Sequence, residues 1–145
     1  MRSLIQRLLN NQIIYYFAQF ALTAVFWQSG LSKLLNFGDT QLEMASHGLT
    51  PTWLFAALTV AIQIIGPLIL IFGRRLVWLA AAGLIVFTIG TMMVAHPFWQ
   101  LSDPVAHQAA LAELYPHLTY IGGFLLSAIA AELKYNPSAW SRTYQ

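Results

Sequence analysis

Lys33 is the side chain whose position most needs a specific explanation. It lies near one end of a long apolar run at residues 13–35. If that run spans a membrane, a cation there is costly unless it has a partner or reaches the aqueous surface. Three interpretations follow. Lys33 extends to the surface and sets the depth of the helix, it pairs with Asp39 or Glu43, or it binds an anionic or quinone-like head group.

Gln63, His96 and Trp99 are three further candidates, and each also has a structural interpretation. Gln63 lies inside the next apolar run, where a hydrogen bond between two helices is its simplest role. His96 ends the third run and either caps backbone carbonyls or acts as a titratable donor. Trp99 belongs either to the aromatic belt at a membrane surface or to the wall of a binding site.

Other chemistry finds no support in the residue types and their spacing. The four histidines lack the spacing of a compact metal site, so we expect no bound metal. The chain has no cysteine, which excludes thiol and disulfide chemistry. It also lacks a nucleophile elbow and a glycine-rich phosphate loop, and whether it is an enzyme stays open. A net charge of only +2 excludes a nucleic-acid footprint.

The elements that position these residues are apolar helices. Only 8% of the 145 residues are charged, against roughly 25% in a soluble domain. Four apolar runs cover residues 13–35, 52–72, 76–95 and 117–133, each close to the length of a membrane-spanning helix. They are continuous, whereas membrane strands alternate. The sequence therefore predicts an all-α integral membrane four-helix bundle that forms a single domain over residues 1–145.

Two connections are longer than a tight turn requires. We expect residues 36–51 to form a loop, and we expect the other connection, up to Pro116, to contain a short surface helix over residues 105–115. The Asp103-Pro104 pair is typical of a helix start. Pro116 then predicts a break or kink before the fourth span.

The distribution of charge predicts the orientation in the membrane. Four spans place six of the seven cations on one side, and only Lys33 on the other. Because cytoplasmic loops carry an excess of Lys and Arg, both termini are expected to be cytoplasmic. All four histidines and four of the five carboxylates then fall on the outer side.

Small residues predict where the helices pack against one another. Helix association in lipid depends on close backbone approach and on interhelical hydrogen bonds. The residues that fit such contact faces are Gly30, Gly66, Gly83, Gly90, Gly123 and Ser127.

Several segments together resemble the DoxX family of small four-helix membrane proteins. They are Phe26–Leu34 with its Gly-x-x-Lys pattern, His47–Pro51, Ile65–Arg74, His96–Trp99 and the double-glycine segment Tyr120–Leu126. They occur in order over nearly the whole chain. Family members often carry a glutamate where this chain has Gln63, which can form hydrogen bonds but cannot exchange a proton.

The resemblance implies a bacterial inner-membrane protein that is a small subunit of a redox or oxidative-stress assembly. Its partners would be the bilayer and a redox enzyme or another protein, and a homo-oligomer is compatible with it. No cofactor is evident from the residues, but a quinone-type lipophile would bind at the outer face near Lys33, Gln63, His96 and Trp99. A non-catalytic membrane anchor or scaffold subunit is the alternative. A small-solute permease is least favoured, because repeats and midplane charges are missing.

Overall fold

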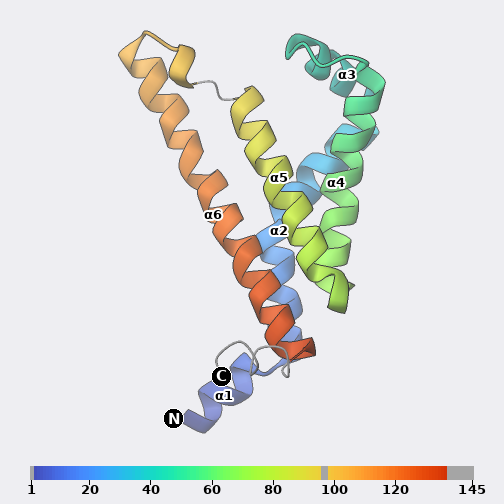
Figure 1. Ribbon diagram of the computed structural model, residues 1–145, viewed down its shortest axis with the longest axis vertical. Coiled ribbons are helices and arrows are strands. Elements are labelled where there is room, and N and C mark those ends of the chain that lie inside the picture. The colour runs from blue at the N-terminus through green and yellow to red at the C-terminus, as the bar shows by residue number, and fades with distance from the viewer. Residues whose placement is uncertain (1, 96–97, 137–145) are drawn as a thin grey trace.

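The computed structural model describes residues 2–95 and 98–136, and every regular element in those ranges is a helix. The helices are α1 (Arg2–Leu9), α2 (Gln12–Leu35), α3 (Phe37–Ser46), α4 (Thr52–Phe72), α5 (Val77–Ala95) and α6 (Pro104–Tyr135), with short 3₁₀ turns η1 (Arg74–Leu76) and η2 (Phe98–Gln100). The four long helices α2, α4, α5 and α6 run along the long axis of the molecule (Figure 1). Helix α3 lies at one end and α1 at the other. The predicted all-α membrane architecture is confirmed.

Three segments of the described chain are long and apolar enough to cross a membrane. They are Thr52–Phe72, Arg74–Ala95 and Pro104–Tyr135. Helix α2 has a sufficient length of 24 residues, but Gln19, Gln28 and the tyrosines near its start make it less apolar than the other three. It packs along α4 and also contacts α6. The span over residues 13–35 therefore stays a prediction.

Helix α6 corrects the expected course of the chain after α5. The separate surface helix over residues 105–115 and the break at Pro116 are wrong, because one helix of 32 residues runs through both. Asp103 caps its start by accepting a hydrogen bond from the Ala106 amide at 2.8 Å. Pro116 removes only one backbone donor, and membrane helices tolerate such a loss when nearby polar groups satisfy the carbonyls. The carbonyl that loses its donor is that of Ala112, and His117 Nδ1 bonds to the neighbouring Glu113 carbonyl at 2.7 Å.

The segment expected to be a loop over residues 36–51 contains helix α3. Asn36 ends α2 and begins α3, so the chain reverses there. The Thr40 hydroxyl lies 3.0 Å from the Lys33 carbonyl and donates to it, which ties α3 to the last turn of α2. Thr40 and Met44, one helical turn apart, are the buried residues of α3. Helix α3 consequently packs back on α2 and α4.

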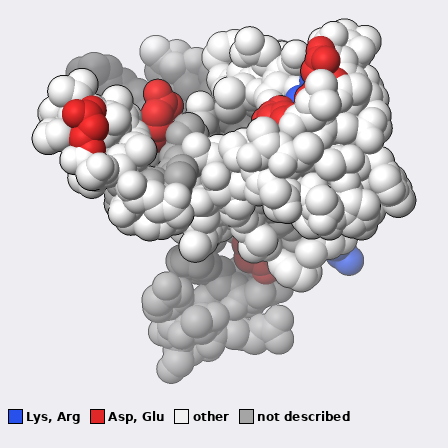
Figure 2. Space-filling view, turned by 90° about the horizontal axis from the view of Figure 1, so that it is seen from above, with Lys and Arg blue, Asp and Glu red and all other residues white. Residues whose placement is uncertain are grey.

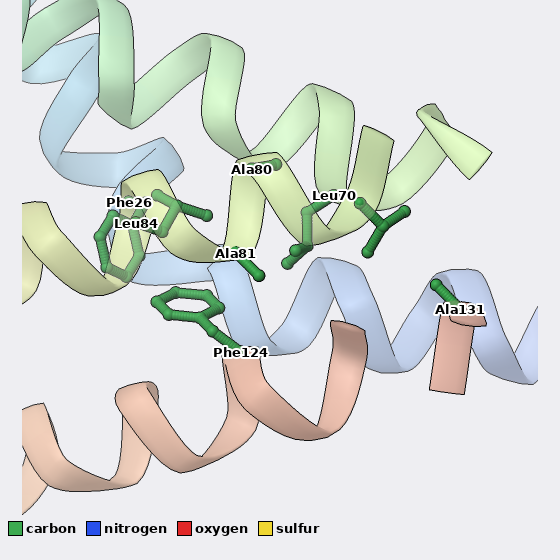
Figure 3. Close-up of a cluster of buried hydrophobic side chains, with 8 residues drawn as sticks. Phe26, Leu70, Ala80, Ala81, Leu84, Phe124 and Ala131 are labelled. Carbon is green, nitrogen blue, oxygen red and sulfur yellow. The ribbon is translucent and has the colours of Figure 1, made fainter. Parts of the chain in front are cut away.

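The core lies where the four long helices meet. Its buried members are Phe26, Leu70, Val77, Ala80, Ala81, Leu84, Phe124 and Ala131, most of which are labelled in Figure 3. The rings of Phe26 and Phe124 meet edge to face, with centroids 5.3 Å apart, a favoured arrangement for aromatic pairs. The core residues of α5 all lie in its first half. The second half of α5 does not pack tightly against α4, and the space between these two helices is the candidate site.

Helices approach each other closely at several of the glycines that were expected to lie on packing faces, and Gly90 is the exception. A Cβ atom at Gly30 would lie 2.9 Å from Gln63 Cβ, and one at Gly66 would lie 2.9 Å from Leu84 Cδ2. Real Cβ contacts are not that short. At Gly30 the close atoms lie at the base of the Gln63 side chain and on its backbone, so the helices would have to separate, whereas at Gly66 the flexible end of the Leu84 side chain would have to move. At Gly90, however, an added Cβ would meet nothing within 4 Å. Gly90 faces open space, because α5 has diverged from its neighbour at that level.

Candidate functional site

A cavity of about 460 Å³ lies between α4 and α5, with α3 at one end. Its walls are mainly apolar, with Phe55 and Ile62 from α4 and Phe87 from α5 among them. The volume is within the range of small-molecule sites, which are mostly apolar with a few polar groups that orient the ligand. The polar groups here lie at the α3 end and on one wall.

The polar end of the cavity is formed by an ion pair between Lys33 and Glu43. Lys33 is in the last turn of α2, and Glu43 is on the face of α3 that the chain reversal brings back toward it. The Lys33 side chain is only 19% exposed. Of the two carboxylates considered as partners, the structure pairs Lys33 with Glu43. The charges of the pair compensate each other, so this end of the cavity carries no isolated cation.

Gln63 provides a polar group on the wall. Its Nε2 donates to the Ser29 hydroxyl oxygen at 3.1 Å, which links α4 to α2. Its Oε1 is buried and has no hydrogen-bond partner in the described part of the chain. A buried polar atom without a partner costs stability, and such atoms are rare enough to need an explanation. Gln63 lines the cavity, and a rotation of its amide group would turn this buried oxygen toward a donor on a bound molecule.

The cavity opens sideways toward the outside of the bundle. Leu58 on α4, together with Val86 and Val94 on α5, lines the cavity and is also exposed on the molecular surface. These residues lie within segments long and apolar enough to cross a membrane. A molecule dissolved in the bilayer could therefore reach the cavity without passing through water.

The end of the molecule that carries α3 is acidic. Figure 2 views this end and shows Asp and Glu side chains on both sides of the face, with little Lys or Arg. Asp39 and Glu43 belong to α3, while Asp103 and Glu113 lie at and near the start of α6. An anionic ligand would be repelled by this surface. The charge distribution thus favours a neutral molecule.

The structure brings together two of the four predicted site residues. Lys33 and Gln63 line one cavity. Trp99 lies in η2, on the connection between α5 and α6; it is 52% exposed and does not line the cavity. The expected wall at Trp99 is therefore not part of this site. His96 lies outside the described residues.

Two contributions to the cavity, from α3 and from the second half of α5, were not predicted from the sequence. His47 and Met44 line the cavity at the α3 end, in a segment expected to be a loop. The four-residue spacing of Thr40 and Met44 was the available sign of a helix there. Gly83 and Gly90, seven residues apart on α5, are expected from the sequence to pack against other helices, and both line the cavity. A Cβ atom at Gly83 would also lie 3.2 Å from Ile62 Cδ1 on α4, whereas one at Gly90 would meet nothing within 4 Å.

Comparison with known proteins agrees with this architecture. The sequence model of the DoxX family matches residues 16–97, a range that contains most of α2 and all of α3, α4 and α5. The chain is also similar to the inner membrane protein YphA of Escherichia coli (strain K12), with 26% identity over 118 residues that cover 81% of this chain and 82% of that protein. No solved structure matches the chain. Because the family match covers more than half of the chain and includes the helices that form the cavity, this membrane protein belongs to the DoxX family.

Proposed function

We propose that this protein is an inner-membrane protein that binds a neutral, quinone-type lipophile between α4 and α5. The observation that carries the proposal is the largely apolar cavity of about 460 Å³, which has the Lys33–Glu43 pair at one end and the unpaired Gln63 oxygen on its wall. This combination suits a molecule with a polar ring and an apolar tail. The family membership and the name of the relative support the inner membrane as the location.

Each polar group has a distinct role in the proposed complex. The Lys33 ammonium donates a hydrogen bond to a ring carbonyl of the quinone while Glu43 keeps its charge balanced. Gln63 Oε1 accepts a hydrogen bond from a ring hydroxyl when the ligand is in its reduced form. The tail leaves through the opening beside Leu58 and Val86. The protein thereby holds the ring and lets a partner enzyme carry out electron transfer, as a small subunit of a redox or stress-response assembly.

The proposed orientation places both termini in the cytoplasm. Helix α1, the connection between α4 and α5, and the last turn of α6 lie toward the end of the molecule opposite α3 (Figure 1). They carry Arg7, Arg74, Arg75 and Lys134, and an excess of cations is characteristic of the cytoplasmic side. The cavity then faces the outer leaflet of the membrane.

Binding of a decyl-substituted benzoquinone to the full chain in mild detergent tests the proposal. A Gly90→Leu variant fills the cavity from a position where an added Cβ atom meets no protein atom within 4 Å. We expect it to weaken binding by more than about tenfold, equivalent to about 1.4 kcal/mol.

Gly122 offers the matched control. It is also a helical glycine at which an added Cβ atom would meet open space, but it does not line the cavity. A Gly122→Leu variant should bind like the wild type. Absence of binding to the wild type, or equal weakening in both variants, would refute the site.

One observation favours the alternative function of a non-catalytic anchor or scaffold. Helix α1 exposes the apolar side chains of Leu4, Ile5, Leu8 and Leu9. Such a surface suits either the membrane interface or a partner protein. Under this alternative, a partner co-purifies with the wild type in mild detergent and quinone binding is absent. Charged substitutions at Leu4 and Leu8 then abolish recovery of the partner.

A further inference from the structure

A second hollow lies at the end of the molecule opposite the cavity. It has a volume of about 400 Å³ and is lined by Gly73, Arg74, Arg75 and Tyr135. It forms where η1, the connection between α4 and α5, contacts the last part of α6. We call it the basic hollow. It shares no residue with the cavity described above, and its interpretation is independent of the proposed function.

Two cations are held beside the single ring of Tyr135. The Arg74 Cζ atom is 5.4 Å from the ring centroid, and Lys134 Nζ is 5.3 Å from it. Lys134 Nζ also lies 4.4 Å from the centroid of the Tyr15 ring. Cation–π attraction fixes these side chains, but two like charges near one ring repel each other. An anion bound between them would remove that repulsion.

No carboxylate compensates these cations in the described part of the chain. The ion pair that the described residues form joins Lys33 and Glu43, at the other end of the molecule. The carboxylate nearest in sequence is Glu132, whose Oε2 accepts a hydrogen bond from Asn136 Nδ2 at 3.1 Å. The basic hollow therefore has an excess of positive charge.

The backbone at the basic hollow has an uncommon conformation. Arg74 has a φ of 45°, in the left-handed region that residues other than glycine seldom adopt. Gly73 precedes it, and a Cβ atom there would lie 2.4 Å from the Ile69 carbonyl oxygen. The tight connection thus holds the consecutive residues Arg74 and Arg75 at the basic hollow. Residues held in such conformations cluster at ligand sites.

We propose that the basic hollow binds the phosphate of an anionic phospholipid head group. The apolar helix α4 ends at Phe72, α5 begins at Val77 and α6 ends at Tyr135, so the hollow lies at the level where lipid head groups begin. Guanidinium groups bind phosphate oxygens with paired hydrogen bonds. Basic pockets between membrane helices bind anionic head groups in this way. A soluble phosphate ester has the same chemistry, and the experiment separates the two.

Native mass spectrometry of the full chain in detergent tests the site. The wild type is titrated with dioleoyl phosphatidylglycerol and, separately, with dioleoyl phosphatidylcholine. Each cation near a head group contributes about a fivefold preference for an anionic lipid, so two arginines should give about a 25-fold preference. The Arg74→Gln/Arg75→Gln variant should lose this preference. Arg7→Gln, which removes a cation outside the hollow, should keep it.

Two further measurements make the outcome decisive. Phosphatidylglycerol binding to the wild type should weaken as salt concentration rises, a result that requires no variant to fold. Glycerol 3-phosphate at millimolar concentration should not displace the lipid. Equal loss in the Arg7 control and the double variant, or no preference in the wild type, would overturn the site. Binding of glycerol 3-phosphate without a lipid preference would overturn the lipid as its occupant.

Discussion

At the scale of single residues, the ion pair between Lys33 and Glu43 explains how a lysine is accommodated near the end of an apolar helix. The turn at Asn36 brings the carboxylate within reach, and the Thr40 hydroxyl holds α3 against the Lys33 carbonyl. Removing one charge would leave the other without compensation. The pair should therefore be coupled energetically, although Glu43 is partly open to solvent.

A double-mutant cycle tests this coupling. Lys33→Met and Glu43→Gln should each destabilise the protein, and the double variant should lose about 1 kcal/mol less than the sum of the two, as expected for a partly exposed pair. The free energy of unfolding in a detergent or bilayer system provides the measurement. Strict additivity would show that the two charges do not interact.

The buried hydrogen bond between Ser127 and Gln19 gives a second prediction at this scale. The Ser127 hydroxyl donates to Gln19 Oε1 at 2.8 Å and links α6 to α2. Ser127→Ala leaves that oxygen without its donor and should lower the free energy of unfolding by about 1 kcal/mol. Thr119→Ala is the control, because its hydroxyl bonds within its own helix on an exposed face. Equal effects of the two substitutions would contradict this interpretation.

At the scale of the helices, close packing of α2 on α4 depends on Gly30. A methyl group there would lie 2.9 Å from Gln63 Cβ and 3.3 Å from the Gln63 backbone carbonyl carbon, so the helices would have to move apart. That movement would also shift the Gln63 amide, which lies on the wall of the cavity. Helix contact and site geometry are consequently linked at this position.

Gly30→Ala should lower the free energy of unfolding by about 1–3 kcal/mol, the usual cost of overpacking. Gly122→Ala should be neutral or slightly stabilising, because open space surrounds that position and alanine has the higher helix propensity. Thermal unfolding of both variants checks the difference. If Gly30→Ala is as stable as Gly122→Ala, α2 and α4 do not pack closely at this position.

At the scale of the whole molecule, the two ends differ in charge and in the kind of ligand that they suit. The α3 end is acidic and holds the largely apolar cavity, for which we propose a neutral lipophile. The opposite end holds the hollow lined by Arg74 and Arg75, for which we propose a lipid phosphate. Labelling of cysteines can determine which end faces the cytoplasm, and the chain contains no cysteine of its own to interfere.

Asn10→Cys and Ser46→Cys place single thiols at exposed positions near opposite ends of the molecule. With cytoplasmic termini, a membrane-impermeant maleimide added to spheroplasts should label Ser46→Cys directly. It should label Asn10→Cys only after the membrane is permeabilised. The reverse pattern would invert the proposed orientation.

The amino-acid sequence by itself determined that this protein lies in a membrane, that it folds into helices and that its charges are distributed unevenly. These depend on local properties: an apolar run must satisfy its own backbone hydrogen bonds in lipid, and only a helix does so within one segment. The capping of α6 by Asp103 was equally predictable, because it involves residues three positions apart. The family resemblance likewise followed from ordered local motifs.

Only the tertiary structure decided which residues form a site. Glu43 meets Lys33 because the chain reverses at Asn36, and Gly90 faces a cavity because α5 diverges from α4 after its tightly packed first half. Pro116 lies within a continuous helix, although it provides no amide donor for the Ala112 carbonyl. Contacts of this kind depend on how helices cross and separate in space, and hydropathy along a single helix does not contain that information.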